Sequence, residues 1–308
     1  TQQHFTYGER NNTRIYCGII ADNTYLYLGT DNGILVYNYR TDKYEQPETD
    51  FPTDVRTMAL QGDTLWIGSL NGLYTYQLNT KKLASLDSKS NGLPHHTIYS
   101  IIRTTDNQIY VGTYNGLCRY IEESGKFENI PLPVNRNVSN LFVNSLLEDT
   151  SRQCIWIGME GSLFQYTPAT GLMKPIDAFH NNSIKSLALD GDGNLLAGTD
   201  NGLYVYQNDN GTLQHIVHDS RNIQSLTNNI IWNIFADQEQ NIWLGTDYGI
   251  SLSRYNSALQ FIPISQITGT GDGNQFYSLF RDSKGFYWFG GTNGVIRFTN
   301  PTGNKHDA

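Results

Sequence analysis

The sequence predicts an all-β protein: a seven-bladed β-propeller whose blades are four-stranded antiparallel sheets. The first observation is an internal repeat, because the phrase LWIGSLNGLYTY at 65–76 returns nearly unchanged as IYVGTYNGLCRY at 109–120. The second is that seven copies follow one another at intervals of 39 to 47 residues, which is the length typical of a four-stranded propeller blade. The third is a composition with 29 Gly and 20 Tyr but only 16% charged residues, which favours strands and turns over helices.

Each copy is anchored on the glycine that is the fourth residue of the phrase: Gly29, Gly68, Gly112, Gly158, Gly198, Gly245 and Gly290. In the third copy four strand-length runs surround this glycine, at 97–104, 109–113, 117–122 and 127–130. Turn-forming residues separate the runs: TDNQ, then YNG, then ESGK. Short runs of this kind, bounded by turn signals, predict four antiparallel strands per copy.

The turn between the second and third strands carries Asn-Gly in five copies: Asn32-Gly33, Asn71-Gly72, Asn115-Gly116, Asn201-Gly202 and Asn293-Gly294. We expect a two-residue type I′ turn there, because Asn and Gly tolerate the positive φ that this turn needs at both central positions. The sixth copy has Tyr248-Gly249, a less favourable pair for such a turn.

Two residues before each anchor glycine lies a large side chain: Tyr27, Trp66, Tyr110, Trp156, Leu196, Trp243 or Trp288. This column could form an aromatic binding surface, or it could pack each blade against the next. Its recurrence in every copy, in step with the strands, favours packing. We therefore assign these residues to the core.

The whole chain, 1–308, is predicted to be a single propeller. The seventh copy reaches its third strand at 295–298 and then continues as polar TNPTGNKHDA, which is a poor strand. Residues 4–9, HFTYGE, precede the first copy where a fourth strand belongs. We expect them to complete blade 7 and to close the ring, which protects the sheet edges.

Charge and cysteine content exclude several classes of function. A net charge of −8 without a basic tract argues against contact with nucleic acid. Three scattered cysteines, Cys17, Cys118 and Cys154, form neither a disulfide framework nor a zinc motif, so we expect no metal and no cofactor. The chain has no apolar run of the roughly 18–20 residues that a membrane span needs and opens without a signal peptide. We expect a soluble piece of something larger.

The candidate ligand site is a position early in the first strand of each copy: Tyr16, Arg56, Tyr99, Asn144, Lys185, Trp232 and Tyr277. From this position to the anchor glycine the spacing is 12–14 residues, whereas from the glycine to the next such position it is 27–34. Length therefore varies mainly after the second strand, in loops such as 87–96 and 218–229, and variable loops on a rigid scaffold often carry specificity.

Propeller topology brings these loops and the second-to-third-strand turns to one face, at the mouth of the central channel. Aromatic rings there can pack on sugar rings, while Arg, Lys and Asn hydrogen-bond hydroxyls or carboxylates, so the column is a plausible saccharide site. The alternative is that these side chains only fill the channel. The next residue in each copy is small, from Cys17 to Ser278, which suits crowded inner strands. His95 and His96 end a long loop and are interpreted as solvated.

The segments GLPHHTIYSIIRTTDNQIYVGTYNGLCRY, SLTNNIIWNIFADQEQNIWLGTDYGI and GNLLAGTDNGLYVY resemble the two-component regulator propeller repeat. In that family such blades form the periplasmic sensor of hybrid two-component systems in Bacteroidetes, which are inner-membrane proteins. The resemblance implies a ligand-sensing domain of a histidine kinase that responds to an oligosaccharide from polysaccharide breakdown. It also implies, as partners, a second propeller and a β-sandwich in the same chain, and a homodimer of the full-length sensor.

Two other classes of function stay open. Related propellers include lyases that use clustered His and Glu, but this sequence shows no paired acid–base motif, so we expect no catalytic residues in this fragment. A protein-interaction scaffold would use the same face to hold a polypeptide. Fold alone does not choose among these functions.

Overall fold

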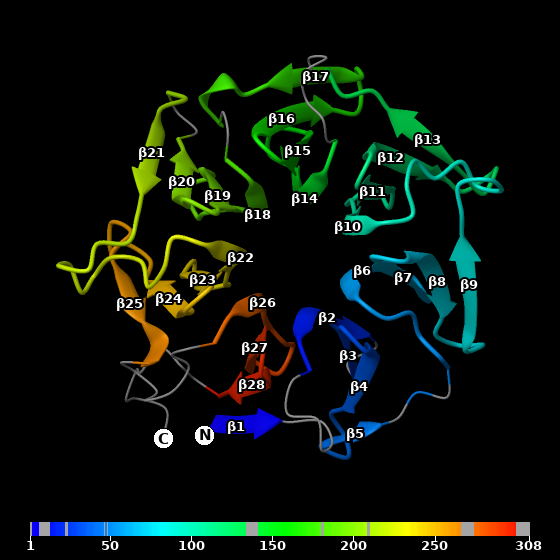
Figure 1. Ribbon diagram of the computed structural model, residues 1–308, viewed down its shortest axis with the longest axis horizontal. Coiled ribbons are helices and arrows are strands. Elements are labelled where there is room, and N and C mark those ends of the chain that lie inside the picture. The colour runs from blue at the N-terminus through cyan, green and yellow to red at the C-terminus, as the bar shows by residue number, and fades with distance from the viewer. Residues whose placement is uncertain are drawn as a thin grey trace. The chain divides into compact units, whose positions relative to one another are not determined.

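The computed structural model describes residues 2–5, 13–21, 24–45, 47, 49–133, 141–179, 182–207, 210–265 and 274–299. Their strands form seven four-stranded antiparallel sheets, the blades of a seven-bladed β-propeller (Figure 1). The predicted fold class is therefore confirmed. The chain divides into two compact units, Tyr16–Ile184 and Thr1–Ile15 with Lys185–Ala308.

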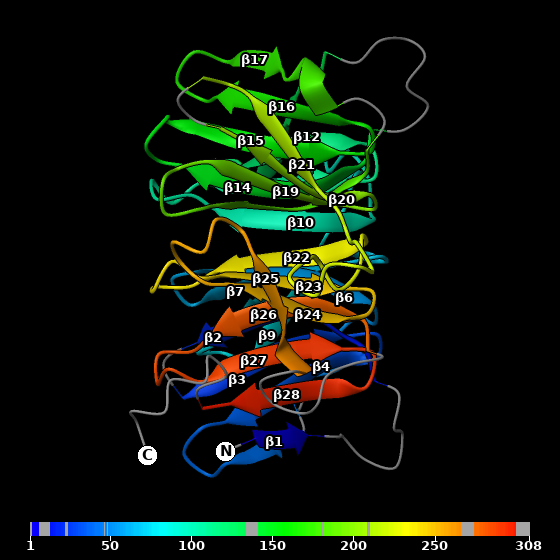
Figure 2. The same cartoon turned by 90° about the vertical axis from the view of Figure 1, so that its left-hand side faces the viewer.

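The first unit, Tyr16–Ile184, contains blades 1 to 4, each formed by four strands consecutive in sequence. Blade 1 comprises β2 (Ile15–Ala21), β3 (Tyr25–Thr30), β4 (Gly33–Asn38) and β5 (Lys43–Glu45). Blade 2 comprises β6 (Val55–Gln61), β7 (Thr64–Ser69), β8 (Gly72–Gln77) and β9 (Lys82–Leu86). Blade 3 comprises β10 (Ile98–Arg103), β11 (Ile109–Thr113), β12 (Gly116–Ile121) and β13 (Lys126–Ile130). Blade 4 comprises β14 (Val143–Asp149), β15 (Cys154–Met159), β16 (Ser162–Thr167) and β17 (Leu172–Pro175), followed by the short 3-10 helix η1 (Asp177–Phe179); its strands lie in sequence order (Figure 2).

The second unit contains blades 5 to 7 and uses both ends of the chain. Blade 5 comprises β18 (Ile184–Leu189), β19 (Leu195–Thr199), β20 (Gly202–Tyr206) and β21 (Leu213–Ile216). Blade 6 comprises β22 (Ile231–Ala236), β23 (Ile242–Thr246), β24 (Gly249–Ser253) and β25 (Phe261–Pro263). Blade 7 comprises β26 (Phe276–Arg281), β27 (Tyr287–Gly291), β28 (Gly294–Phe298) and the N-terminal strand β1 (Gln2–Phe5).

The N-terminal strand pairs antiparallel with β28, with Gln2 opposite Phe298 and Phe5 opposite Val295. The sequence placed this strand at 4–9. In the structure it begins two residues earlier and ends at Phe5, and residues 6–9 lie outside the described residues.

The repeated glycine marks a close approach between neighbouring blades. A Cβ atom added to Gly112 would lie 2.3 Å from Ser100 Oγ and 2.6 Å from Val143 Cγ1. At Gly68 the same added atom would lie 2.6 Å from Ile98 Cγ2, on the first strand of the next blade. Because real Cβ contacts are never this short, only glycine lets the second strand of one blade meet the first strand of the next.

The tryptophan column is core, as predicted. Trp156, Trp243 and Trp288 are at most 1% exposed. Each indole N–H has a buried carboxylate partner at the end of the blade's first strand, in the pairs Trp156–Asp149 (3.0 Å), Trp243–Asp237 (2.8 Å) and Trp288–Asp282 (2.7 Å). The same carboxylates accept backbone N–H groups of the following turn, including those of Arg152, Asn241 and Phe286. Sequence reasoning missed these acidic residues, which tie each turn to the core.

The turn between the second and third strands is not the predicted type I′ turn with Asn and Gly as its two central residues. In blade 1, Thr30 pairs with Gly33, so the loop residues are Asp31 and Asn32, and the glycine begins β4. Gly33 has a φ of +121°, whereas no Asn of these turns is among the described non-glycine residues with positive φ. This is the behaviour of loops in which a glycine of positive φ follows a type I turn. Since the demand for positive φ falls on glycine alone, Tyr248 fits the preceding position in blade 6.

The small residue in each first strand links blades as well as saving space. Side-chain oxygens of this column accept a backbone N–H from the first strand of the next blade, in the pairs Thr57–Ile101 (3.1 Å), Ser186–Ile234 (3.0 Å) and Asn233–Leu279 (3.2 Å). Each bond satisfies a backbone donor that would otherwise be buried without a partner.

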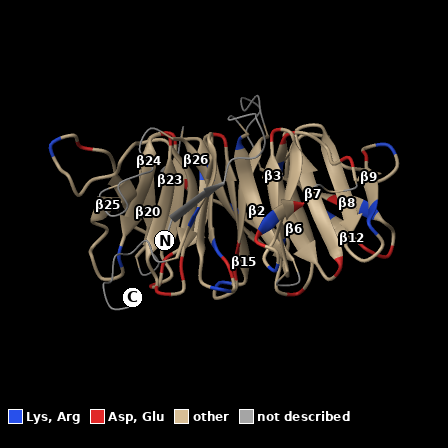
Figure 3. Cartoon of the chain, turned by 90° about the horizontal axis from the view of Figure 1, so that it is seen from below, with Lys and Arg blue, Asp and Glu red and all other residues tan. Residues whose placement is uncertain are grey.

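Charged residues lie mainly on the turns and loops at the strand ends (Figure 3). The strands between them are largely uncharged, so the ends of the blades are where polar ligands can be recognised. Within the described ranges, no helix is long and apolar enough to cross a membrane.

Candidate functional site

The seven predicted site residues occupy equivalent places in the structure. Each is the second residue of the first strand of its blade, and each is half-buried: Tyr16, Arg56, Tyr99, Asn144, Lys185, Trp232 and Tyr277. The first residue of each of these strands is fully buried, as Ile231 and Val55 show at 0% exposure. The column therefore lies at the boundary between the core and the surface.

A β-bulge in the first strand changes the direction of the column side chain in five blades. The register between the first and second strands shifts at this residue in blades 2, 3, 4, 6 and 7, which leaves Arg56, Tyr99, Asn144, Trp232 and Tyr277 without an opposite partner. A bulge inserts one extra residue, bends the strand and changes the direction of the side chain, and bulges are common next to binding sites. The repetition of the bulge explains why large side chains recur beside small ones.

In the second unit, Trp232 contacts the column residues of the blade before it and the blade after it. Lys185 Nζ lies 4.6 Å from the centre of the Trp232 ring. The rings of Trp232 and Tyr277 meet edge to face, with centroids 5.3 Å apart. A cation over an indole face contributes about 0.5–1 kcal/mol where it is exposed and more where it is desolvated, so these contacts order the cluster before any ligand arrives.

Two residues outside the predicted column fix this cluster. Asp247, in the turn after β23, accepts the Trp232 indole N–H at 3.0 Å and a Gln275 amide N–H at 2.5 Å. Gln275 in turn accepts the Tyr277 hydroxyl at 2.6 Å. We call Lys185, Trp232, Asp247, Gln275 and Tyr277 the tryptophan cluster.

Sequence reasoning missed Asp247 and Gln275. The recurrence of Asp before the turn, in TDNG and TDYG, was the available signal for Asp247. Nothing in the repeat pointed to Gln275, which lies directly before β26 and outside the repeated strand positions.

In the first unit, Arg56 lies over the ring of Tyr16, with Cζ 3.7 Å from the ring centre. Its ion pair with Asp54 is long, at 3.5 Å, and its Nε–H is buried without a hydrogen-bond partner. In both units, then, a column cation packs on a column aromatic ring of a neighbouring blade. The sequence analysis treated the aromatic rings and the cations as individual ligand contacts. In the structure, these two cations each pack on an aromatic ring.

The neighbouring column residue Tyr99 is influenced by this cation. Burial raises the pKa of Tyr99, and the positive charge of Arg56 opposes that rise. The Tyr99 hydroxyl is therefore a neutral hydrogen-bonding group at physiological pH. Asn144, the fourth column residue of this unit, follows in the next blade, at the bulge of β14.

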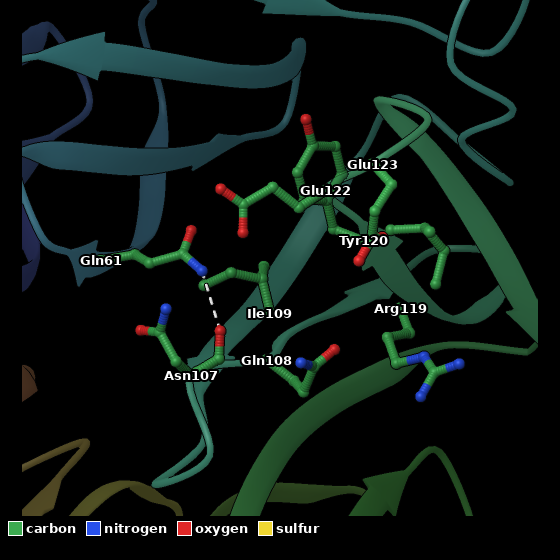
Figure 4. Close-up of a pocket in the computed structure, with 9 residues that line it drawn as sticks. Gln61, Asn107, Gln108, Ile109, Arg119, Tyr120, Glu122 and Glu123 are labelled. Carbon is green, nitrogen blue, oxygen red and sulfur yellow. Dashed lines mark hydrogen bonds between the residues drawn. The ribbon is translucent and has the colours of Figure 1, made fainter.

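A cavity of about 320 Å³ lies at the opposite ends of these strands, between blades 2 and 3 (Figure 4). Gln61 points across it and donates to the Asn107 carbonyl at 2.8 Å, and the same Gln61 accepts the Trp66 indole N–H. Arg119 on its wall pairs with Glu128 at 2.6 Å, a hydrogen bond that raises the pKa of Arg119. Gln61 therefore ties blade 2 to blade 3, whereas the Arg119–Glu128 pair lies within blade 3.

Among the residues that the structure describes, no group of three or more His, Cys, Asp or Glu is placed to hold a metal ion.

Comparisons with known proteins agree with the repeat architecture. The family described as two component regulator propeller matches residues 92–115, 225–248 and 270–293. A curated relative, histidine kinase P4 of Formosa agariphila, is 29% identical over 312 residues, which is 89% of this chain and 21% of that protein.

Solved structures that resemble this chain also include extracellular domains of two-component systems. Crystal structures of the extracellular domain of the B. thetaiotaomicron system BT4673, described as one-component and as hybrid two-component, are 83% identical, with a TM-score of 0.79. They match 99% of this chain, which spans 41% of that domain. A second hybrid two-component extracellular domain of that organism, at 16% identity and a TM-score of 0.73, and the Staphylococcus aureus virginiamycin B lyase, at 14% and 0.73, share the fold. The chain thus contains three segments that match the two component regulator propeller family, and it is similar along nearly its whole length to the extracellular domain of a B. thetaiotaomicron two-component system.

Proposed function

We propose that this chain is the ligand-sensing part of a hybrid two-component histidine kinase and lies in the periplasm. Its 83% identity to such an extracellular domain supports this location. Because the chain spans less than half of that domain, the complete sensor includes further segments, which we propose to be a second propeller and a β-sandwich, and it works as a homodimer.

The proposed ligand is an oligosaccharide released by polysaccharide breakdown, bound in the second unit by the column residues Lys185, Trp232 and Tyr277. The tryptophan cluster carries this proposal. Trp232 offers a half-buried ring held by Lys185, Tyr277 and Asp247, and a few fixed polar groups around an aromatic ring are typical of small-molecule sites.

Catalysis by this fragment is not part of the proposal. The likeness to virginiamycin B lyase is at 14% identity, a level that supports the shared fold and no shared chemistry. Kinase activity would belong to another part of the full-length protein.

The test uses Trp232 as a built-in reporter. The other four tryptophans are at most 2% exposed, so a change of tryptophan emission with added oligosaccharide reports on Trp232. An oligosaccharide at ~100 times its Kd should also raise the free energy of unfolding by roughly 2.7 kcal/mol. Trp232→Phe should abolish the emission change, and Trp232→Ala should weaken the stabilisation, whereas Tyr255→Phe, at an exposed turn after β24, should alter neither. Full stabilisation of Trp232→Ala by the same oligosaccharide would refute the assignment.

A further inference from the structure

A second group of aromatic side chains gathers in the first unit, on blade 3 and the segments beside it. Its rings follow one another at contact distances. His96 stacks on His95 (4.3 Å), His95 lies 4.9 Å from Tyr114, Tyr114 meets Phe142 at 4.0 Å, and Phe142 meets Tyr99 at 5.8 Å. We call His95, Tyr99, Tyr114 and Phe142 the aromatic platform.

The platform is not a requirement of the fold. Tyr114 is 38% exposed, and it occupies the first position of the turn between the second and third strands. The same position in the other six blades carries no aromatic residue: Asp31, Leu70, Glu160, Asp200, Asp247 and Thr292. Neither turn geometry nor the core therefore demands a ring at this place.

Hydrogen bonds hold the platform's segments in place. The backbone N–H of Tyr114 donates to the Thr97 carbonyl, and that of Gly116 donates to the Leu141 carbonyl, each at 3.0 Å. The loop that carries His95 is anchored by Leu93, which is 2% exposed. Rings presented on fixed segments lose little conformational entropy when a ligand binds.

Each of three platform rings carries a polar atom at its edge. Tyr99 and Tyr114 have hydroxyl groups. His95 Nδ1 accepts the Thr97 backbone N–H at 3.0 Å, and burial, together with the charge of His96, lowers the pKa of His95. The neutral imidazole therefore carries its proton on Nε2. Apolar faces bordered by hydrogen-bonding edges match a pyranose ring, which has C–H faces and hydroxyl edges.

We propose that the aromatic platform is a second saccharide subsite, which takes one pyranose ring against Tyr114, with hydroxyl contacts from Tyr99 and His95. This inference rests on the proposed function and adds a site in the other unit of the chain, distinct from the tryptophan cluster. It assigns a role to His95, whose sequence context indicated only a solvated loop.

The experiment screens the chain, residues 1–308, on a printed array of plant and animal oligosaccharides and then measures the best binder by calorimetry. Tyr114→Ser should weaken binding at least about tenfold, equivalent to about 1.4 kcal/mol. The control Tyr255→Ser removes another exposed tyrosine, 48% exposed against 38% for Tyr114, from the turn after the third strand of a blade and should leave affinity unchanged. Melting temperatures of both variants should match that of the parent.

The outcomes separate the two sites. Affinity lost in Tyr114→Ser but kept in Tyr255→Ser supports the platform. Binding that depends on Trp232 and is indifferent to Tyr114→Ser overturns the platform and leaves the proposed function standing. An array on which no oligosaccharide binds the parent chain counts against both.

Discussion

Asp149 shows how a single buried charge is stabilised in a blade. Its side chain is fully buried, and it accepts hydrogen bonds from Ser151 Oγ (2.6 Å), the Arg152 backbone and the Trp156 indole, besides an ion pair with the Arg152 guanidinium. Burial alone would raise the pKa of Asp149, but these hydrogen bonds outweigh it and hold the pKa below its usual range. The carboxylate is therefore the form on which the fold depends.

Stability should consequently fall in acid. Because the pKa of Asp149 in the folded chain lies below that of the unfolded chain, about 3.9, the carboxylate stabilises the fold above that pH. The contribution disappears as the pH falls through the folded pKa. Asp149→Asn should lower the free energy of unfolding at pH 7 by about 2 kcal/mol or more, measured by urea denaturation, and should flatten its dependence on pH below about 5.

The exposed Asp192, in the corresponding turn of blade 5, provides the control for Asp149. Asp192→Asn should leave both the stability at pH 7 and its dependence on pH nearly unchanged. An equally flat pH profile in this control would show that Asp149 is not the responsible group.

At the scale of the strand, the anchor glycine sets how closely two blades approach. Gly112→Ala should destabilise the chain by about 3 kcal/mol, because its Cβ would overlap Ser100 and Val143 and overpacking at a rigid contact is expensive. Gly62→Ala is the comparison: a Cβ there meets nothing within 4 Å, and only the φ of +55° opposes it, for about 1 kcal/mol. Equal losses in the two variants, measured by chemical denaturation, would contradict the role of the close approach.

Hydrogen bonds from the small column residues join neighbouring first strands. Ser186→Ala leaves the buried Ile234 N–H without its partner and should cost about 1–3 kcal/mol of stability. Ser186→Thr retains the hydroxyl and should recover most of that loss. Ser85→Ala on the exposed outer strand β9 serves as a matched control, with a change near zero in the same denaturation experiment.

At the scale of the whole molecule, blade 7 joins the two ends of the chain. Deletion of residues 1–9 removes β1 and leaves the edge of β28 unpaired. We expect the melting temperature to fall by several degrees, at roughly 2–4 °C per kcal/mol for a chain of this size class. A synthetic peptide of residues 1–9 should restore part of the loss in calorimetry; an unchanged melting temperature after deletion would argue against a stabilising role of β1.

The blade count, the strand order within each blade and the core column could all be predicted from the sequence. Each depends on local periodicity: strand-length runs, a turn glycine and one large apolar residue recur every 39 to 47 residues. The turn type was wrong because Asn-Gly satisfies two loop geometries, and only the pairing of Thr30 with Gly33 distinguishes them.

The sequence by itself determined that large side chains recur at one place in each first strand, and it supplied all seven of them. Only the tertiary structure decided that bulges re-aim five of these residues, that Lys185 and Arg56 pack on rings of neighbouring blades, and that Asp247 and Gln275 hold Trp232 and Tyr277. The physical reason is that a residue type repeated in every copy reflects a structural requirement that all seven blades share. The contacts of the tryptophan cluster join residues far apart in the sequence whose types differ from blade to blade, so no periodic pattern encodes them.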